Sequence, residues 1–113
     1  MTMPPVAVEW ADPALDALRR IGSRTTQEKI IAKAGELAHH SDPAQLGKPL
    51  QDELRGYHRL SYGRYRIIYR VRSSGASMGR IVQIVYVGIR KAGDKRDVYE
   101  QAEKLRRRGL IEL

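Results

Sequence analysis

In the segment 65–72, arginines stand four and two positions apart, and this spacing is suited to binding phosphate groups. In an extended strand, Arg66, Arg70 and Arg72 project from the same face. Each guanidinium offers paired N–H donors that fit a phosphate, and it keeps its proton near neutral pH. The segment therefore predicts a surface for a polyanionic ligand.

The basic residues are concentrated in the second half of the chain. Residues 1–48 contain six Lys or Arg and six Asp or Glu, whereas residues 49–108 contain fifteen and six. Fifteen of the 21 basic residues are arginines, and the formal net charge is +8. This distribution indicates contact with a nucleic acid or the ribosome. The alternative is a basic surface that only keeps the protein soluble.

Composition also excludes several classes of protein. The 113 residues include no cysteine, which excludes disulfides and thiolate metal sites and favours a reducing compartment. Residues 1–10 lack a basic region followed by an apolar run, and no segment approaches the ~18 apolar residues of a membrane span. We therefore expect a single cytoplasmic domain over residues 1–113, with no membrane partner.

The histidines give little support for metal or acid–base chemistry. His39 and His40 are adjacent, so on a helix they point ~100° apart and cannot share one metal ion. The segment 73–79 has glycines but lacks the Lys-Ser/Thr pair of a phosphate-binding loop. Histidine is suited to proton transfer, but strand alternation turns His58 toward the core, which favours a structural role. We expect neither a metal nor a cofactor.

Apolar periodicity predicts the elements that position these residues. Asp12-Pro13 marks the start of a first helix, and Thr25 with Glu28 forms a capping box at a second. The expected order is a strand at 6–10, helices at 12–22 and 25–40, a connection at 45–56, strands at 57–62, 65–72 and 81–89, and a helix at 95–108. This is an α+β fold (β-α-α-β-β-β-α), a mostly antiparallel sheet of about four strands with two N-terminal helices on one face and a C-terminal helix. Because short hairpins join the later strands, we expect the helices to share one face.

Strand alternation divides the side chains between the two faces of this sheet. Apolar and aromatic members of the two hairpin strands share the core face with a histidine: His58, Leu60, Tyr62, Tyr65, Ile67, Tyr69 and Val71. Arg59 and Ser61 then lie beside Arg66 on the other face. Charges that protect an edge strand account for one or two such residues but not for a row on neighbouring strands. We therefore expect an open face rich in arginine.

Five short motifs follow one another along the chain. They are GKPL (47–50), LRGYHRL (54–60), YRIIY (65–69), VGIR (87–90) and DVY (97–99). Together, in this order and spacing, they resemble the RelE/ParE toxin superfamily of type II toxin-antitoxin systems. The resemblance spans nearly the whole chain, and the family fold agrees with the predicted order of elements.

The resemblance implies a metal-independent endoribonuclease that cuts mRNA, in the ribosomal A site. The residues that match the catalytic set of RelE-like toxins are Arg59, Arg66, Arg90 and Tyr99. In such a reaction the 2′-hydroxyl attacks its own phosphodiester, so Arg66 and Arg90 would clamp the phosphate and Tyr99 would orient the hydroxyl or relay its proton. The alternative function is that of a ParE-like DNA gyrase poison, a class that generally lacks this catalytic set. For Tyr99 alone, the alternative is a packing role on the sheet.

Two departures from the family pattern leave further alternatives open. RelE carries a second basic residue at the position that matches Ser61 of this chain. Either another group takes the proton or the activity is weaker, and a non-catalytic RNA- or ribosome-binding module is a third alternative. The insertion Lys91–Lys95 shifts the alignment with the family by a residue or two, so Arg96 is an alternative to Arg90 as the catalytic arginine that follows the VG pair.

Further contacts are expected with RNA and with a protein partner. Polar and basic residues around the catalytic set are expected to bind RNA: Arg55, Arg59, Ser61, Arg70, Lys91, Lys95 and Arg96. The expected partners are mRNA, the ribosome and a cognate antitoxin. Because a cationic active site is hazardous when free in a cell, the antitoxin is expected to carry an acidic amphipathic helix that covers or displaces the helix at 95–108 and masks the arginine face.

Overall fold

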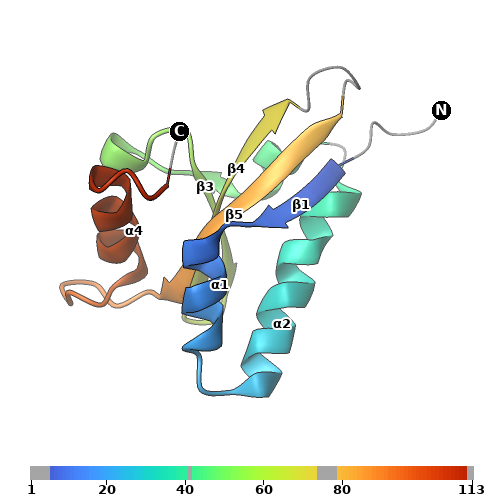
Figure 1. The fold of residues 1–113 in the computed structure, drawn as a ribbon. Coiled ribbons are helices and arrows are strands. Elements are labelled where there is room, and N and C mark those ends of the chain that lie inside the picture. Colours follow the sequence, from blue (N-terminus) through green and yellow to red (C-terminus); the bar gives the residue numbers. More distant parts are fainter. Residues whose placement is uncertain (1–5, 41, 74–78, 112–113) are drawn as a thin grey trace.

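The computed structural model describes residues 6–40, 42–73 and 79–111, which form a five-stranded sheet with helices on both faces (Figure 1). The strands are β1 (Val6–Trp10), β2 (Lys48–Pro49), β3 (His58–Tyr62), β4 (Tyr65–Ser73) and β5 (Arg80–Ile89). The helices are α1 (Asp12–Arg19), α2 (Arg24–Gly35), α3 (Pro43–Leu46) and α4 (Val98–Arg107), with the short 3-10 helices η1 (Glu36–His39) and η2 (Asp52–Leu54). The predicted α+β class is confirmed.

The strand order in the sheet is β1-β5-β4-β3-β2, so the first strand lies beside the last. β1 runs parallel to β5, and the other neighbouring strands are antiparallel. The sheet has one strand more than predicted, because Lys48–Pro49, inside the predicted connection, pairs with β3. This pairing brings the segment after α3 to the edge of the sheet.

The first face of the sheet is covered by α1 and α2. The buried residues of this face come from these helices, from η1 and from the three central strands: Ala14, Ala17, Leu18, Ile30, Ala34, Leu37, Leu60, Ile67, Tyr69, Val82, Ile84 and Val87. Within each helix they recur three or four positions apart, which gives the helix one apolar side. Tyr62, Tyr65 and Val71 pack against the same cluster, as strand alternation predicted.

The second face is covered by α4, so the prediction that the helices share one face is wrong. Val98 of α4 is buried together with Ile68 of β4 and Val85 of β5. Ile68 places an apolar side chain between Arg66 and Arg70, and a bulge in the pairing of β4 with β5 brings Val85 to the same face. The prediction of an open arginine face is therefore wrong. This face carries a second, smaller hydrophobic core, and the arginines lie around it.

The described helices lie close to the predicted ones, with differences at their ends. The N-cap of α2 is Ser23, whose Oγ accepts a hydrogen bond of 3.2 Å from the backbone N–H of Thr26. A cap at Thr25 was wrong because Ser23 offers the same kind of oxygen two residues earlier. α4 begins at Val98, three residues later than predicted, and residues 74–78 of the predicted turn lie outside the described residues. No helix in the described part of the chain is long and apolar enough to cross a membrane.

Candidate functional site

A hollow of about 370 Å³ opens on the second face, where β3, the end of β5 and the first turns of α4 meet. Leu50 and Leu54 form part of its apolar lining. Arg59, Arg90 and Tyr99, three of the four residues expected to be catalytic, also line it. They come from separate parts of the chain, so only the folded structure brings them together. We refer to this site as the Tyr99 hollow.

Arg90 is held in the Tyr99 hollow by Asp97, the residue that caps α4. Arg90 Nη1 donates a hydrogen bond of 2.8 Å to Asp97 Oδ1, and Arg90 Cζ lies 5.0 Å from the centroid of the Tyr99 ring. The backbone N–H of Lys91 also donates to Asp97 Oδ1, and that of Tyr99 donates to Oδ2 at 3.1 Å. One carboxylate therefore fixes the end of β5, the Arg90 guanidinium and the start of α4 relative to one another.

Asp97 is stabilised in its charged form although its side chain is only 3% exposed. Burial raises the pKa of this carboxyl, but hydrogen bonds from the Lys91 N–H, the Arg90 guanidinium and the Tyr99 N–H outweigh burial. The net result is a pKa below the ordinary value. The Arg90 side chain is 41% exposed. It is therefore a fixed cation that keeps part of its surface free for an anionic ligand.

The opposite rim of the hollow depends on a close backbone approach at Gly47. A Cβ at this position would lie 2.5 Å from the Arg59 carbonyl oxygen and 2.5 Å from the Tyr69 hydroxyl. That hydroxyl accepts a hydrogen bond of 2.9 Å from the Gly47 N–H and donates one of 2.7 Å to the Pro43 carbonyl. Burial raises the pKa of Tyr69 to about 12, so it remains a donor at neutral pH. These bonds tie the GKPL segment to Tyr69 of β4, and the pairing of Lys48 with Arg59 joins it to β3, so that both Leu50 and Arg59 line the hollow.

Arg66, the fourth expected catalytic residue, lies on the same face of the sheet but outside the lining of the hollow. In the sheet it stands between Ser61 of β3 and Gly88 of β5. Its Nη1 donates hydrogen bonds of 2.9 Å to the carbonyls of Gly63 and Tyr65, which folds the guanidinium back over the β3–β4 turn. The structure thus brings three of the four residues together and leaves Arg66 on the neighbouring strand.

Two carboxylates also line the Tyr99 hollow. Glu103 lies one turn after Tyr99 on α4, and Asp52 begins η2. Burial raises the pKa of Glu103, and the nearby carboxylates of Glu53 and Glu100 raise it further. The hollow therefore combines two arginines, a tyrosine and a carboxyl whose pKa lies above its ordinary value.

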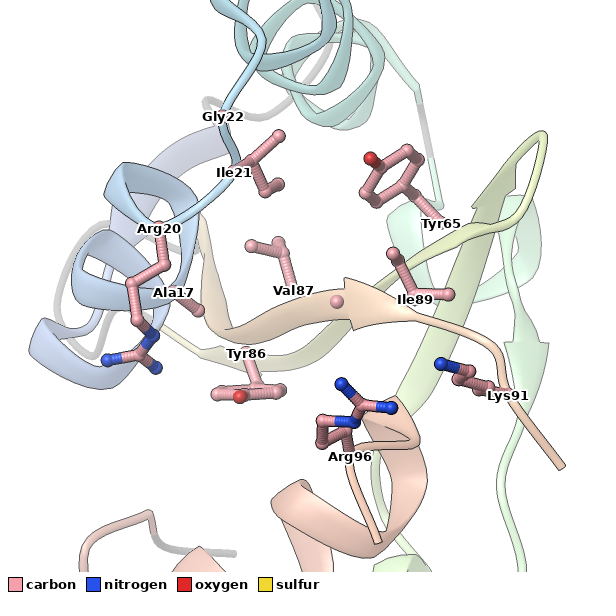
Figure 2. Close-up of a pocket in the computed structure, with 11 residues that line it drawn as sticks. Ala17, Arg20, Ile21, Gly22, Tyr65, Tyr86, Val87, Ile89, Lys91 and Arg96 are labelled. Atoms are coloured by element: carbon pink, nitrogen blue, oxygen red, sulfur yellow. The ribbon is translucent and has the colours of Figure 1, made fainter. Parts of the chain in front are cut away.

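A second hollow, of about 380 Å³, lies beside the end of β5, next to α1. Figure 2 shows Arg20 and Arg96 extending on either side of the Tyr86 ring, with Tyr65 and Lys91 at the β5 end of the hollow. The apolar floor includes Val87 and Ile89, drawn in the same view. We refer to this site as the Tyr86 hollow. It is cationic and aromatic, and none of the described residues that line it carries a carboxylate.

The two rival arginines therefore lie in different sites. Arg90 shares the Tyr99 hollow with Tyr99 and Arg59, whereas Arg96 lines the Tyr86 hollow. The Arg96 side chain is 77% exposed, and its Nε lies 3.2 Å from Asp94 Oδ1. This bond and the charge of Arg96 hold the pKa of Asp94 at about 2. The geometry favours Arg90 over Arg96 as the partner of Tyr99.

The other residues expected to bind RNA do not converge on the Tyr99 hollow. Lys91 lines the Tyr86 hollow, while Arg55, Ser61 and Lys95 are exposed outside both hollows. Arg70 is half-buried in β4, where its Nε donates a hydrogen bond of 2.8 Å to the side chain of Gln83. Arg70 is therefore engaged within the sheet.

His58 is packed on the first face of the sheet. Its ring stacks on that of Tyr69, with the centroids 5.4 Å apart. Burial lowers the pKa of His58, and the charge of Asp42 opposes this effect. This placement agrees with the structural role favoured by strand alternation. Among the described residues, no group of three or more His, Asp or Glu side chains is arranged to hold a metal ion.

Sequence analysis did not predict the roles of two acidic residues: Asp97, which holds Arg90, and Glu103, which lines the Tyr99 hollow. Asp97 stands immediately before Val98 in the DVY motif, so its role as an N-cap could have been predicted. Its bond to Arg90 could not, because it depends on how the end of β5 meets α4. Glu103 follows Tyr99 by four residues, a spacing that places both on one face of a helix and could have drawn attention to it.

Comparisons with known proteins agree with this architecture. Residues 8–92 match the family model described as the ParE toxin of the type II toxin-antitoxin system parDE, and no curated protein sequence matches the chain. The RelBE2 toxin-antitoxin complex from Mycobacterium tuberculosis contains a similar chain, with a TM-score of 0.62 and 28% identity over 79% of this chain and 95% of that chain.

Two further solved structures share the fold at lower identity. A free RelE toxin from E. coli, in a doubly substituted form, gives a TM-score of 0.61 and 21% identity over 91% of this chain and 97% of that chain. The YoeB/ParE toxin from Agrobacterium tumefaciens gives a TM-score of 0.50 and 18% identity over 75% of this chain and 99% of that chain. The RelE-like fold is thereby confirmed, and the chain belongs to the RelE/ParE family of toxins from type II toxin-antitoxin systems.

Proposed function

We propose that this toxin is a metal-independent endoribonuclease that cuts mRNA in the ribosomal A site. The observation that carries the proposal is the convergence of Arg59, Arg90 and Tyr99 in one hollow of about 370 Å³. Guanidinium groups stabilise the negative charge that develops on phosphorus oxygens, and a phenol hydroxyl can hydrogen-bond a ribose hydroxyl. These side chains therefore match the needs of RNA phosphodiester chemistry.

The proposed reaction needs charge at the phosphate and alignment of the 2′-hydroxyl. Arg90, fixed by Asp97 and partly exposed, would bind the phosphate, and Arg59 would approach it from β3. Arg66 would join them if its guanidinium turned away from the β3–β4 turn. Tyr99, which lies under the Arg90 guanidinium, would orient the 2′-hydroxyl for attack on phosphorus.

We also propose mRNA on the ribosome as the substrate, in the cytoplasm, and a cognate antitoxin as the regulatory partner. Residues 49–108 carry fifteen Lys or Arg against six Asp or Glu, which favours a polyanionic substrate. Two of the similar solved structures, RelBE2 from M. tuberculosis and RelBE from E. coli, are toxin-antitoxin complexes. An acidic amphipathic helix of the antitoxin would cover or displace α4 and thereby close the Tyr99 hollow.

A second candidate function is poisoning of DNA gyrase. It is favoured by the match of residues 8–92 to a family model named for ParE. In this case the arginines would contact DNA or gyrase, and Tyr99 would serve only to pack against Arg90. Both functions predict a toxic protein, so toxicity alone does not separate them.

Primer extension on a messenger RNA after induction of the toxin separates these functions. Discrete cuts within codons, absent after induction of an Arg90→Ala variant, are the result expected for a ribonuclease. Intact messenger together with an SOS response and linear DNA complexes would instead favour gyrase poisoning. Purified protein that binds ribosomes or RNA without cutting would favour a non-catalytic module.

A further inference from the structure

The proposed cleavage needs a group that takes the proton of the 2′-hydroxyl. Ser61, the position at which the chain departs from the RelE pattern, carries no group that ionises near neutral pH. His58 stacks on Tyr69 on the first face of the sheet, away from the Tyr99 hollow. Among the described residues that line the hollow, the carboxylates belong to Asp52 and Glu103. These are the candidates for the missing base.

Glu103 is the better placed of the two carboxylates. It follows Tyr99 by four residues on α4, so the two side chains share one face of the helix and line the same hollow. Glu103 is half-buried, whereas Asp52 is exposed. Arg107, one turn further along α4, lies 2.7 Å from Glu53 and does not pair with Glu103. Among the described residues Glu103 has no salt-bridge partner, so its carboxylate is available to a ligand.

The groups around Glu103 increase its tendency to bind a proton. The charged groups that face it come from η2, α4, β3 and the end of β5: Asp52, Glu53, Glu100, Arg107, Arg59 and Arg90. Burial is the main cause that raises its pKa, Glu53 and Glu100 raise it further, and Arg107 opposes them. A carboxylate whose pKa is moved toward the working pH is a better proton acceptor than an ordinary one.

We propose that Glu103 is the general base of the cleavage reaction, an inference that rests on the proposed ribonuclease function. Its carboxylate takes the proton of the 2′-hydroxyl while O2′ forms a bond to phosphorus and the bond from phosphorus to O5′ breaks. The departing O5′ takes a proton from water, and Glu103 later returns its own proton to solvent. The products are a 2′,3′-cyclic phosphate and a 5′-hydroxyl, with no net change in protons.

The test compares Glu103→Gln with Glu100→Gln, a matched change at an exposed position of the same helix outside the hollow. Single-turnover cleavage on programmed ribosomes is measured from about pH 5 to pH 8, together with ribosome affinity. The wild-type rate is expected to fall toward acid pH as Glu103 becomes protonated. Glu103→Gln should cleave about tenfold more slowly or worse at neutral pH, lose this acid limb and bind ribosomes with nearly unchanged affinity.

Two further readouts distinguish a base from a structural residue. Glu100→Gln removes a like charge that raises the pKa of Glu103, so the acid limb should move to lower pH while the rate at neutral pH stays unchanged. Glu103→Gln should also melt at a higher temperature than the wild type at neutral pH, because it removes a carboxylate that burial and like charges disfavour. A variant that is more stable but slower is not expected from a residue that only supports the fold.

The outcomes separate this inference from the proposed function. Cleavage by the wild type and by Glu103→Gln at equal rates, or an acid limb that remains in Glu103→Gln, would overturn the assignment of the base and leave the ribonuclease function standing. Programmed ribosomes left uncut by the wild-type toxin at every pH would reject the ribonuclease function and this inference with it.

Discussion

Two hollows of nearly equal volume, about 370 Å³ and about 380 Å³, flank the end of β5, yet they hold their arginines differently. In the Tyr99 hollow, Arg90 bonds to Asp97, which is almost completely buried. In the Tyr86 hollow, Arg96 bonds to the more accessible Asp94 and is itself largely exposed. Exposed ion pairs contribute little stability and are screened by salt, whereas a buried carboxylate constrains its partner. The environment of the carboxylate therefore distinguishes the two sites.

This difference suits the hollows to different tasks. A cation that is already fixed needs no reorganisation when charge develops in a transition state, so the Tyr99 hollow is suited to catalysis. The exposed cations of the Tyr86 hollow, Arg20 and Lys91 among them, can attract a polyanion without fixing its geometry (Figure 2). We therefore expect substitutions in the two hollows to separate cleavage from binding.

The largest difference is expected from removing the two arginines in turn. Arg90→Ala should slow single-turnover cleavage on programmed ribosomes about a hundredfold, or ~3 kcal/mol in the barrier, because a fixed cation at the phosphate is lost. Arg96→Ala, the matched change in the Tyr86 hollow, should slow it less than about threefold. A larger loss for Arg96→Ala than for Arg90→Ala would reverse the comparison and assign the late arginine to Arg96.

The fold shows which features of a sequence can be interpreted locally. Alternation in β4 predicted the core face of that strand, and the apolar stripes predicted α1 and α2, because both patterns depend on neighbouring residues. Alternation could not predict that α4 covers the second face. It places Ile68 on the same face as Arg66 and Arg70, but it does not show that a helix packs there. β2 was missed for a similar reason, since its pairing needs the close approach of Gly47 to β3 and Tyr69.

The candidate site shows the same division. The motifs singled out Arg59, Arg90 and Tyr99, and the fold brings these three into one hollow. The VGIR motif favoured Arg90, but the insertion Lys91–Lys95 left Arg96 as an alternative, because the hollow that each side chain enters depends on the folded structure. Contacts between elements, such as the bond from Arg90 to Asp97, exist only after the chain has folded.

Asp97→Asn should have the next largest effect, on stability. Asparagine keeps the size of the side chain and still caps helices, so the variant removes mainly the charge that Arg90 Nη1 and the Lys91 N–H bind. We expect the free energy of unfolding in urea at neutral pH to fall by about 2 kcal/mol. Asp94→Asn, the matched change at the exposed pair, should leave the urea midpoint unchanged.

The pH dependence of stability sharpens this prediction. The pKa of Asp97 is lowered in the folded protein, so its charge stabilises the fold above the pKa of the unfolded chain, about 4. That contribution is lost as the pH falls through the lower pKa of the folded state. Wild type and Asp97→Asn should therefore converge in stability at strongly acid pH. A difference that is constant from neutral to acid pH would show that the charge of Asp97 is not its source.

Tyr99→Phe should have a smaller effect, confined to the rate. The substitution removes one hydroxyl and keeps the ring that lies 5.0 Å from Arg90 Cζ. Cleavage should slow about tenfold, or ~1.4 kcal/mol in the barrier, with ribosome affinity nearly unchanged. Tyr65→Phe makes the same change in the Tyr86 hollow and should cleave at the wild-type rate. Equal rates for Tyr99→Phe and the wild type would reduce Tyr99 to a packing role.

The smallest effect is expected from Lys91→Ala in the Tyr86 hollow. Lys91 Nζ lies 3.7 Å from Asp94 Oδ2 and its side chain is 51% exposed, so this weak pair leaves the ammonium available to a phosphate. If it contacts one phosphate of single-stranded RNA, its loss should weaken binding about twofold to threefold and reduce the salt dependence of log K by ~0.7 in slope. Cleavage at saturating ribosome concentration should not change, because the proposed reaction uses no residue of this hollow. The measurement is a ribosome-binding titration at several salt concentrations, beside single-turnover cleavage under saturating conditions. Slower cleavage with an unchanged salt slope would place Lys91 in the chemistry, and the separation of cleavage from binding between the two hollows would then fail.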